Sequence, residues 1–269
     1  MGANDLQHLV ARNNVNIHGQ GKRPMVFAHG LGCDQTMWRM IAPAFKADHK
    51  IVLFDHVGSG GSDRAAYSQS RYQSLHSYAE DLLELYEVLD LRDSIFVGHS
   101  VSGMIGLIAA NRAPERFSRL IMLGPSPRYL DDDGYVGGFG RSDIDNLLKI
   151  MSLDYVTWSR QMAVAAMARP DKPELVNELT SSFDNADPLI MRHFAEVIFF
   201  SDTRAELPRC LTPTLIMQCQ NDIVVPLAVG EYMHHTIPNS RQVLMRATGH
   251  FPHLSAPDET IAVIGDFIR

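Results

Sequence analysis

A series of short apolar runs, separated by helix-patterned segments, limits the folds that are open to this chain. The runs lie at 24–28, 51–55, 94–98, 119–123, 213–219 and 241–246. Most of them are continuously apolar, which is typical of strands buried on both faces of a parallel sheet. Helical patterns lie between them, at 77–89, 101–111, 228–235 and 258–268. This alternation predicts an α/β protein with a mostly parallel, doubly wound sheet.

The alternation stops between residues 127 and 208, where we find no strand pattern. Four helical patterns occupy this stretch instead, at 142–151, 154–168, 173–183 and 188–200, with prolines between them. The sheet pattern resumes at 213. We therefore expect one core built from residues 1–126 and 209–269, with residues 127–208 inserted as a four-helix lid over one end of the sheet.

Composition narrows the class of protein. The chain has 269 residues, of which 24 are Lys or Arg and 31 are Asp or Glu, so the formal net charge is −7. An acidic balance argues against a nucleic-acid partner. No run approaches the roughly 18 apolar residues of a membrane helix, and residues 1–6 lack the pattern of a signal peptide. Three widely spaced cysteines indicate free thiols, so we expect a cytoplasmic protein.

The strongest chemical signal is FVGHSVSG at residues 96–103. A buried strand ends, a sharp turn follows with Ser100 at its apex, and a helix begins, which is the pattern of a nucleophile elbow. Gly98 supplies the small residue that the turn requires, whereas Ser102 stands where the common G-x-S-x-G pattern has a second glycine. Read alone, Ser100 could instead be an ordinary helix N-cap.

Two later residues favour the nucleophile interpretation. Asp222 follows the strand pattern at 213–219, and His250 follows the last strand pattern at 241–246. Both therefore belong to the carboxyl edge of a parallel sheet, where open α/β sheets gather their active sites. The order Ser100, Asp222, His250 is that of the α/β-hydrolase triad, in which histidine activates serine and the carboxylate orients histidine.

Acyl chemistry also requires donors for a developing oxyanion. The glycine-rich HGLG segment at 29–32 follows a strand, and the helix after the elbow begins at Val101. We expect the backbone N–H groups of Leu31 and Val101 to be these donors. His250 and His253 have a spacing that occurs in metal sites, but no third ligand accompanies them, so we predict no metal site.

Several motifs together carry a family resemblance. They are GHSVS at 98–102, AHGLGCDQ at 28–35, DHVGSG at 55–60, GPSPRYL at 124–130 and GHFPHLS at 249–255. With them the chain resembles the RsbQ-like α/β hydrolases, which include the bacterial stress regulator RsbQ and the plant strigolactone and karrikin receptors. The resemblance implies an α/β-hydrolase fold and a V-shaped four-helix lid above a deep, mostly apolar pocket.

Carried over by position, the resemblance places Leu31, Val101, Phe139, Trp158, Phe194 and Phe199 in the pocket wall. Trp158 and Phe194 also lie within amphipathic helix patterns, so packing of the lid against the sheet explains them equally well.

The expected function is a serine hydrolase that cleaves a small apolar ester or lactone, with a butenolide as one candidate, and that needs no cofactor. The alternative is a ligand-sensing protein that hydrolyses its ligand slowly and binds a regulatory protein through the lid. A carbon–carbon bond hydrolase or a perhydrolase shares the same scaffold, because a fold does not fix a function.

Overall fold

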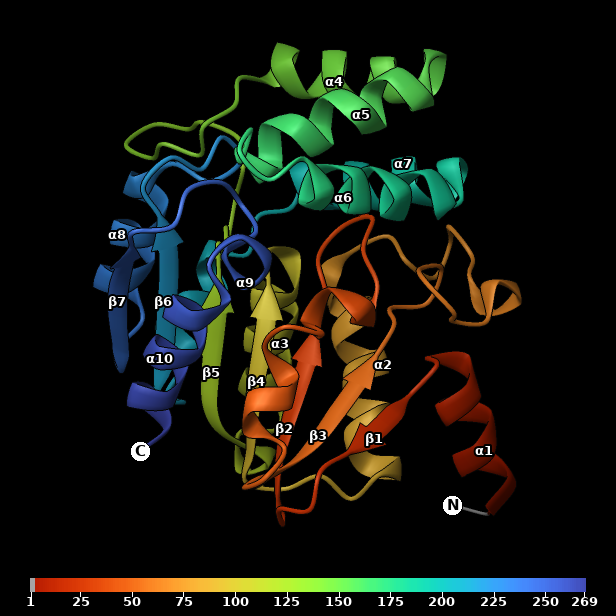
Figure 1. Cartoon of the computed structure of the whole chain (residues 1–269), viewed down its shortest axis with the longest axis vertical. Helices are drawn as coiled ribbons and strands as arrows, with labels where there is room; N and C mark the ends of the chain where they lie inside the picture. Colours follow the sequence, from red (N-terminus) through yellow and green to blue (C-terminus); the bar gives the residue numbers. More distant parts are fainter. Residues whose placement is uncertain (1–2) are drawn as a thin grey trace.

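The computed structural model describes residues 3–269, and a seven-stranded sheet forms its centre (Figure 1). The spatial order of the strands is β1-β3-β2-β4-β5-β6-β7. The strands are β1 (Asn16–His18), β2 (Arg23–Ala28), β3 (His49–Phe54), β4 (Ser94–His99), β5 (Phe117–Leu123), β6 (Thr214–Cys219) and β7 (Ser240–Met245). Only β1 is antiparallel to its neighbour, so the carboxyl ends of the other six strands lie at one edge.

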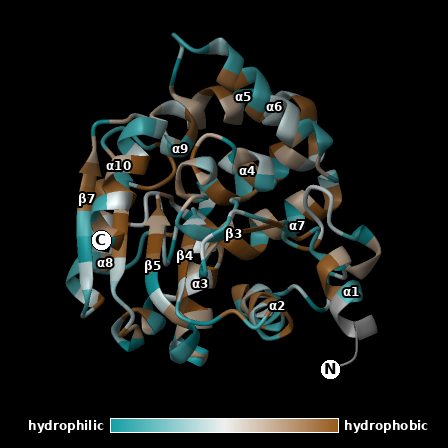
Figure 2. Cartoon of the chain, turned by 60° about the horizontal axis from the view of Figure 1, so that its bottom comes forward, coloured by the Kyte–Doolittle hydropathy of each residue, from teal (hydrophilic) through white to brown (hydrophobic). Residues whose placement is uncertain are grey.

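Helices cover both faces of the sheet, which explains why its strands are continuously apolar. Successive residues of β2 belong to different cores: Val26 packs with one face and Phe27 with the other. On the first face lie α2 (Leu75–Val88), α3 (Val101–Arg112) and α8 (Leu227–Thr236). On the second lie α10 (Pro257–Ile268) and the 3-10 turns η1 (Gln35–Trp38) and η2 (Ala42–Phe45). Figure 2 shows helices that carry both hydrophobic and hydrophilic residues, as this two-sided packing requires.

Four further helices lie above the carboxyl edge of the sheet, and we call them the cap helices (Figure 1). They are α4 (Arg141–Leu153), α5 (Tyr155–Met167), α6 (Pro173–Asn185) and α7 (Pro188–Phe199). Prolines begin α6 and α7, since a proline fits the first helical turn, where its missing N–H has no partner to lose. Each cap helix falls within about two residues of its predicted bounds.

The remaining elements are short. They are α1 (Ala3–Arg12), α9 (Pro252–Ser255) and the 3-10 turns η3 (Arg64–Ala66), η4 (Pro114–Arg116) and η5 (Arg204–Arg209). The sequence predicts the α/β-hydrolase fold and all six parallel strands, and the structure confirms both. The sequence did not predict β1, because its three residues are all exposed and give no apolar pattern. Within residues 3–269, no helix has the length and apolar content needed to cross a membrane.

Candidate active site

The turn between β4 and α3 carries Ser100 with φ of 55°, a left-handed conformation that is unusual outside glycine. This strained turn lifts the serine above the strand that precedes it. Gly98 makes the turn possible, because a Cβ there would lie 2.6 Å from the backbone of Ser102. The elbow geometry expected from the sequence is therefore present.

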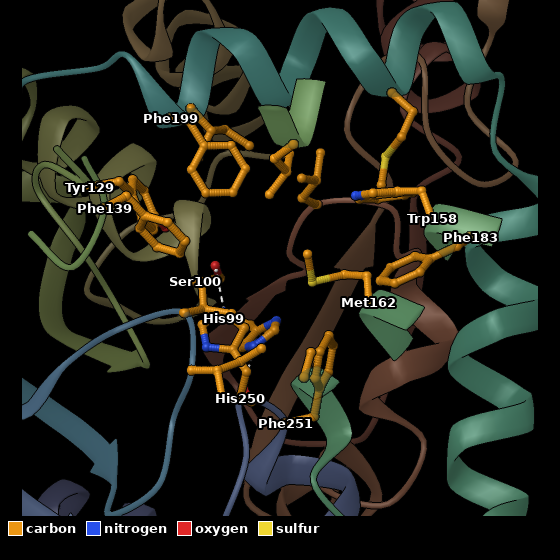
Figure 3. Close-up of a pocket in the computed structure, with 17 residues that line it drawn as sticks. His99, Ser100, Tyr129, Phe139, Trp158, Met162, Phe183, Phe199, His250 and Phe251 are labelled. Carbon is orange, nitrogen blue, oxygen red and sulfur yellow. Dashed lines mark hydrogen bonds between the residues drawn. The ribbon is translucent and has the colours of Figure 1, made fainter. Parts of the chain in front are cut away.

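Ser100, His250 and Asp222 contact one another in succession at the carboxyl edge of the sheet. Figure 3 shows Ser100 beside His250. His250 Nε2 lies 2.9 Å from Ser100 Oγ, and His250 Nδ1 lies 2.7 Å from Asp222 Oδ2. The three side chains come from the end of β4, from the loop after β6 and from the loop after β7, so parallel strand pairing brings them together. The Asp222 side chain is 1% exposed, so the carboxylate faces the imidazole out of water.

Backbone hydrogen bonds hold both Asp222 and His250 in place. Asp222 Oδ1 accepts hydrogen bonds from Val224 N at 2.8 Å and Val225 N at 3.2 Å, which leaves Oδ2 for the histidine. The N–H of His250 donates to the carbonyl of Ala166 at 2.7 Å. Ala166 is in α5, so a cap helix holds the loop that carries the histidine.

Leu31 and Val101, whose backbone N–H groups are the expected oxyanion donors, both belong to segments next to Ser100. Leu31 is in the loop after β2, which approaches so closely that a Cβ at Gly30 would lie 3.3 Å from the Ser100 Cβ. Val101 begins α3, directly after the serine. Neither N–H has a hydrogen-bond acceptor within residues 3–269. Two unused donors beside the serine are what an oxyanion hole requires.

Ser102 departs from the glycine of the common elbow pattern, and its hydroxyl has a structural use. It donates to the carbonyl of His29 at 2.5 Å and lies 2.7 Å from His56 Nε2. Burial holds the pKa of His56 well below its usual value, so this ring is neutral and its Nε2–H donates to Ser102. Ser102 therefore ties the loop after β2 to the elbow helix.

A cavity between the sheet edge and the cap helices opens above Ser100, and we call it the inner cavity (Figure 3). Tyr129, Phe139 and Phe199 lie on one side of it, and Trp158, Met162 and Phe183 on the other. Its wall is almost wholly apolar apart from the serine and histidine side chains. The remaining lining residues are Leu31, His99, Leu147, Ala166, Met191, Ile198, Ile223, Val224, His250 and Phe251.

Of the wall residues expected from the sequence, Leu31, Phe139, Trp158 and Phe199 line the inner cavity. Phe194 was also expected there, but it is not among the residues that line the inner cavity. Its ring stacks on Tyr78 of α2 with centroids 4.4 Å apart, so it packs α7 against the core and does not face the inner cavity. Val101 is buried, and it is its backbone N–H that lies beside the serine.

Sequence analysis missed three phenylalanine or tyrosine residues of the wall, Tyr129, Phe183 and Phe251. Tyr129 lies in the loop after β5, at the sheet edge that also carries Ser100, and this position was an available signal. Its hydroxyl is buried and has no partner within the described residues. Phe183 shows only as part of an apolar stripe on α6, which does not reveal what the stripe faces.

Behind the sheet edge that carries Ser100 lies a group of buried histidines. The His253 ring is 4.7 Å from Trp38 and 4.5 Å from His99, measured between ring centroids. Burial lowers the pKa of His253 to about 3 and holds that of His99 well below its usual value, so both rings are neutral. No cluster of three or more His, Cys, Asp or Glu suited to a metal ion occurs in the described part of the chain.

Because these histidines are buried and neutral, we expect the free energy of unfolding to fall as the solution becomes acidic. The unfolded chain protonates His56, His99 and His253 below pH 6.5, whereas the folded protein resists protonation until much lower pH. For His253 the free energy of unfolding therefore falls by about 2 kcal/mol between pH 7 and pH 5, and His56 and His99 change it in the same direction. Urea denaturation at a series of pH values measures this slope.

A His253→Phe variant keeps an aromatic ring beside Trp38 and removes one titrating group. We expect its stability to depend less steeply on pH, by about one histidine's share. Equal slopes in the variant and the parent protein would contradict the assignment of a neutral, buried His253.

The strand order, the elbow and the Ser100, His250 and Asp222 succession are the features that define α/β hydrolases. A family model described as alpha/beta hydrolase fold matches residues 23–257. The chain is 39% identical to a protein named as a probable esterase from Oryza sativa subsp. japonica, over 94% of each chain. It is 36% identical to "Karrikin insensitive 2 receptor CA" of Petunia hybrida, again over 94% of each.

A solved structure of a hydrolase from Oleispira antarctica matches with a TM-score of 0.95 and 39% identity, covering 98% of this chain and 97% of that one. The chain belongs to the α/β-hydrolase family, within the group that contains these plant esterases and karrikin receptors. The family resemblance drawn from the motifs is thereby confirmed.

Proposed function

We propose that this protein is a serine hydrolase that cleaves a small apolar ester or lactone through an acyl-enzyme. The observation that carries the proposal is the 2.9 Å contact between Ser100 Oγ and His250 Nε2 at the base of an apolar cavity. A hydroxyl alone is a weak nucleophile at neutral pH, whereas a hydroxyl in contact with a neutral imidazole can lose its proton as it attacks.

In the first half-reaction Ser100 Oγ bonds to the substrate carbonyl carbon while its proton passes to His250 Nε2. The carbonyl oxygen becomes an oxyanion, which accepts from the N–H groups of Leu31 and Val101. The ester C–O bond then breaks, and His250 gives its proton to the leaving alcohol oxygen. Asp222 stabilises the imidazolium that exists between these two events.

In the second half-reaction water takes the place of the alcohol. His250 removes one proton from the water as its oxygen attacks the acyl carbon, and the bond to Ser100 Oγ then breaks. The serine recovers its proton and the carboxylic acid leaves. Substrate and water balance the reaction, so these steps call for no cofactor. For a lactone the alcohol and the acid are parts of one product.

The second candidate function is that of a ligand-sensing protein that turns over slowly and binds a regulatory partner. Exposed apolar side chains on the cap helices favour it: Leu153 is 75% exposed and Leu189 is 76% exposed. Solvent-exposed leucines on a cap that covers a ligand cavity are suited to contact with another protein. The receptor named among the relatives also supports this candidate.

One experiment tests the proposal and separates the two candidates. We expect an alkyl fluorophosphonate to label the protein on Ser100, as shown by peptide mapping. We also expect multiple turnovers on a panel of small esters and lactones. A label on another residue would overturn the site. A label on Ser100 together with a single slow turnover on every substrate would favour the sensing function.

A further inference from the structure

A second cavity lies beside the first, and nothing in the proposed reaction uses it. It lies between the loops that follow β2 and β3 and the turn that joins α6 to α7. Unlike the inner cavity above Ser100, this outer cavity has many polar groups in its wall. Its polar side chains are Asp34, Ser59, Arg64, Ser182 and Asn185.

Met191 is the one residue that lines both cavities within the described part of the chain. In two other segments, adjacent residues line different cavities. Leu31 lines the inner cavity and Gly32 the outer, and Phe183 lines the inner while Ser182 lines the outer. The two cavities are therefore neighbours that share a thin wall.

The wall consists of Met191, Phe183 and the backbone of Gly32. A Cβ at Gly32 would overlap both the Met191 Cε and the Phe183 ring, so these two side chains close directly onto the loop after β2. Ser182 holds α6 against the same loop, because its hydroxyl donates a hydrogen bond to the Gly32 carbonyl at 2.8 Å. Met191 itself is 4% exposed, so its side chain is buried in the wall and does not extend into solvent.

Of the two side chains, Met191 is the one that can move. The Phe183 carbonyl accepts from the Tyr155 hydroxyl at 2.8 Å, and its ring packs 5.6 Å from that of Trp158. The Met191 side chain is unbranched and has several rotamers of similar energy. The backbone below it is fixed, since Asp187 caps α7 through the N–H groups of Leu189 and Ile190.

We propose that Met191 is a specificity-determining residue that limits the length of the substrate. This inference rests on the proposed ester hydrolysis. With Met191 in place, an apolar chain ends inside the inner cavity, so short esters are the preferred substrates. Without its side chain the two cavities join, and a longer chain reaches from Ser100 past Gly32 into the outer cavity.

The test compares p-nitrophenyl acetate with p-nitrophenyl octanoate. We expect Met191→Ala to raise kcat/KM for the octanoate about tenfold or more, because each methylene group that gains room contributes to binding in the transition state. The readout is the ratio of kcat/KM for octanoate to that for acetate, since acetate is too short to use the room that the variant opens. Met162→Ala is the matched comparison: it removes the same side chain from the inner cavity alone.

A second substitution asks whether the gain depends on the outer cavity. Ala186 lines the outer cavity and not the inner one. Met191→Ala combined with Ala186→Phe should therefore lose the gain on octanoate, whereas Ala186→Phe alone should leave acetate hydrolysis unchanged. A gain that persists in the double variant, or an equal gain in Met162→Ala, would overturn the role assigned to Met191.

A binding measurement keeps this inference separate from the proposed chemistry. In a Ser100→Ala background, methyl octanoate and methyl butyrate are titrated while the fluorescence of Trp158, which lines the inner cavity, is followed. Adding Met191→Ala should tighten the octanoate about tenfold and leave the butyrate unchanged. Tightening without ester hydrolysis by the parent protein would reject the proposed function and keep the partition. Hydrolysis by the parent protein without tighter octanoate binding in the variant would keep the proposed function and reject the role of Met191.

Discussion

Ser100→Ala is expected to lower kcat for p-nitrophenyl acetate by about 10⁴-fold or more, because removing a triad nucleophile leaves only oxyanion stabilisation and substrate binding. In the structure Ser100 Oγ makes its hydrogen bond with His250 Nε2. Alanine removes that oxygen and leaves the cavity wall as it is. We therefore expect the free energy of unfolding to change by less than about 1 kcal/mol.

Ser102→Ala is the matched control, two residues further along the chain, in the first turn of α3. Its hydroxyl bonds to the His29 carbonyl and to His56, not to His250. We expect this variant to lose about 1–3 kcal/mol of stability, because a buried carbonyl and a buried imidazole lose a partner. Its kcat should remain within about tenfold of the parent value. Similar rates for Ser100→Ala and the parent protein would reject the serine mechanism.

Asp222→Asn is expected to lower kcat by about three to four orders of magnitude while the fold is kept. The two N–H groups of Val224 and Val225 point at Oδ1, so in the variant the amide oxygen takes that position. The amide NH₂ then takes the place of Oδ2 and donates to His250 Nδ1. His250 is thereby held with its proton on Nε2, and a protonated Nε2 cannot accept the proton of Ser100.

Asp187→Asn provides the control for this substitution. Asp187 Oδ1 also accepts from two successive backbone N–H groups, at 2.9 and 3.1 Å, but has no histidine partner among the described residues. Asparagine caps a helix as well as aspartate does, so activity and stability should both persist. A loss of activity in Asp187→Asn as large as that in Asp222→Asn would show that the effect is structural and unrelated to the tautomer of His250.

The sequence was most informative where the signal is local. The run at 94–98 predicts a buried strand because its residues 95–98 are continuously apolar, as a strand covered on both faces must be. FVGHSVSG predicts the sharp turn because few residues other than glycine fit at position 98. The same reasoning could not find β1, an edge strand with exposed residues. The family resemblance placed Phe194 in the pocket wall, whereas its helix pattern explained it equally well by packing; in the structure its ring stacks on Tyr78. Helical periodicity identifies a buried side without identifying what covers it.

The sequence alone predicts that Ser100, Asp222 and His250 lie close together. Ser100, Asp222 and His250 each follow a strand pattern of the parallel type, and parallel strands end at one edge of their sheet. Three other features required the folded chain: which aromatic side chains face the cavity, how Ala166 of α5 holds the His250 backbone, and how Met191 separates two cavities. These features depend on how the cap helices cross the sheet edge, and packing between elements distant in sequence leaves no periodic pattern in the sequence of either one.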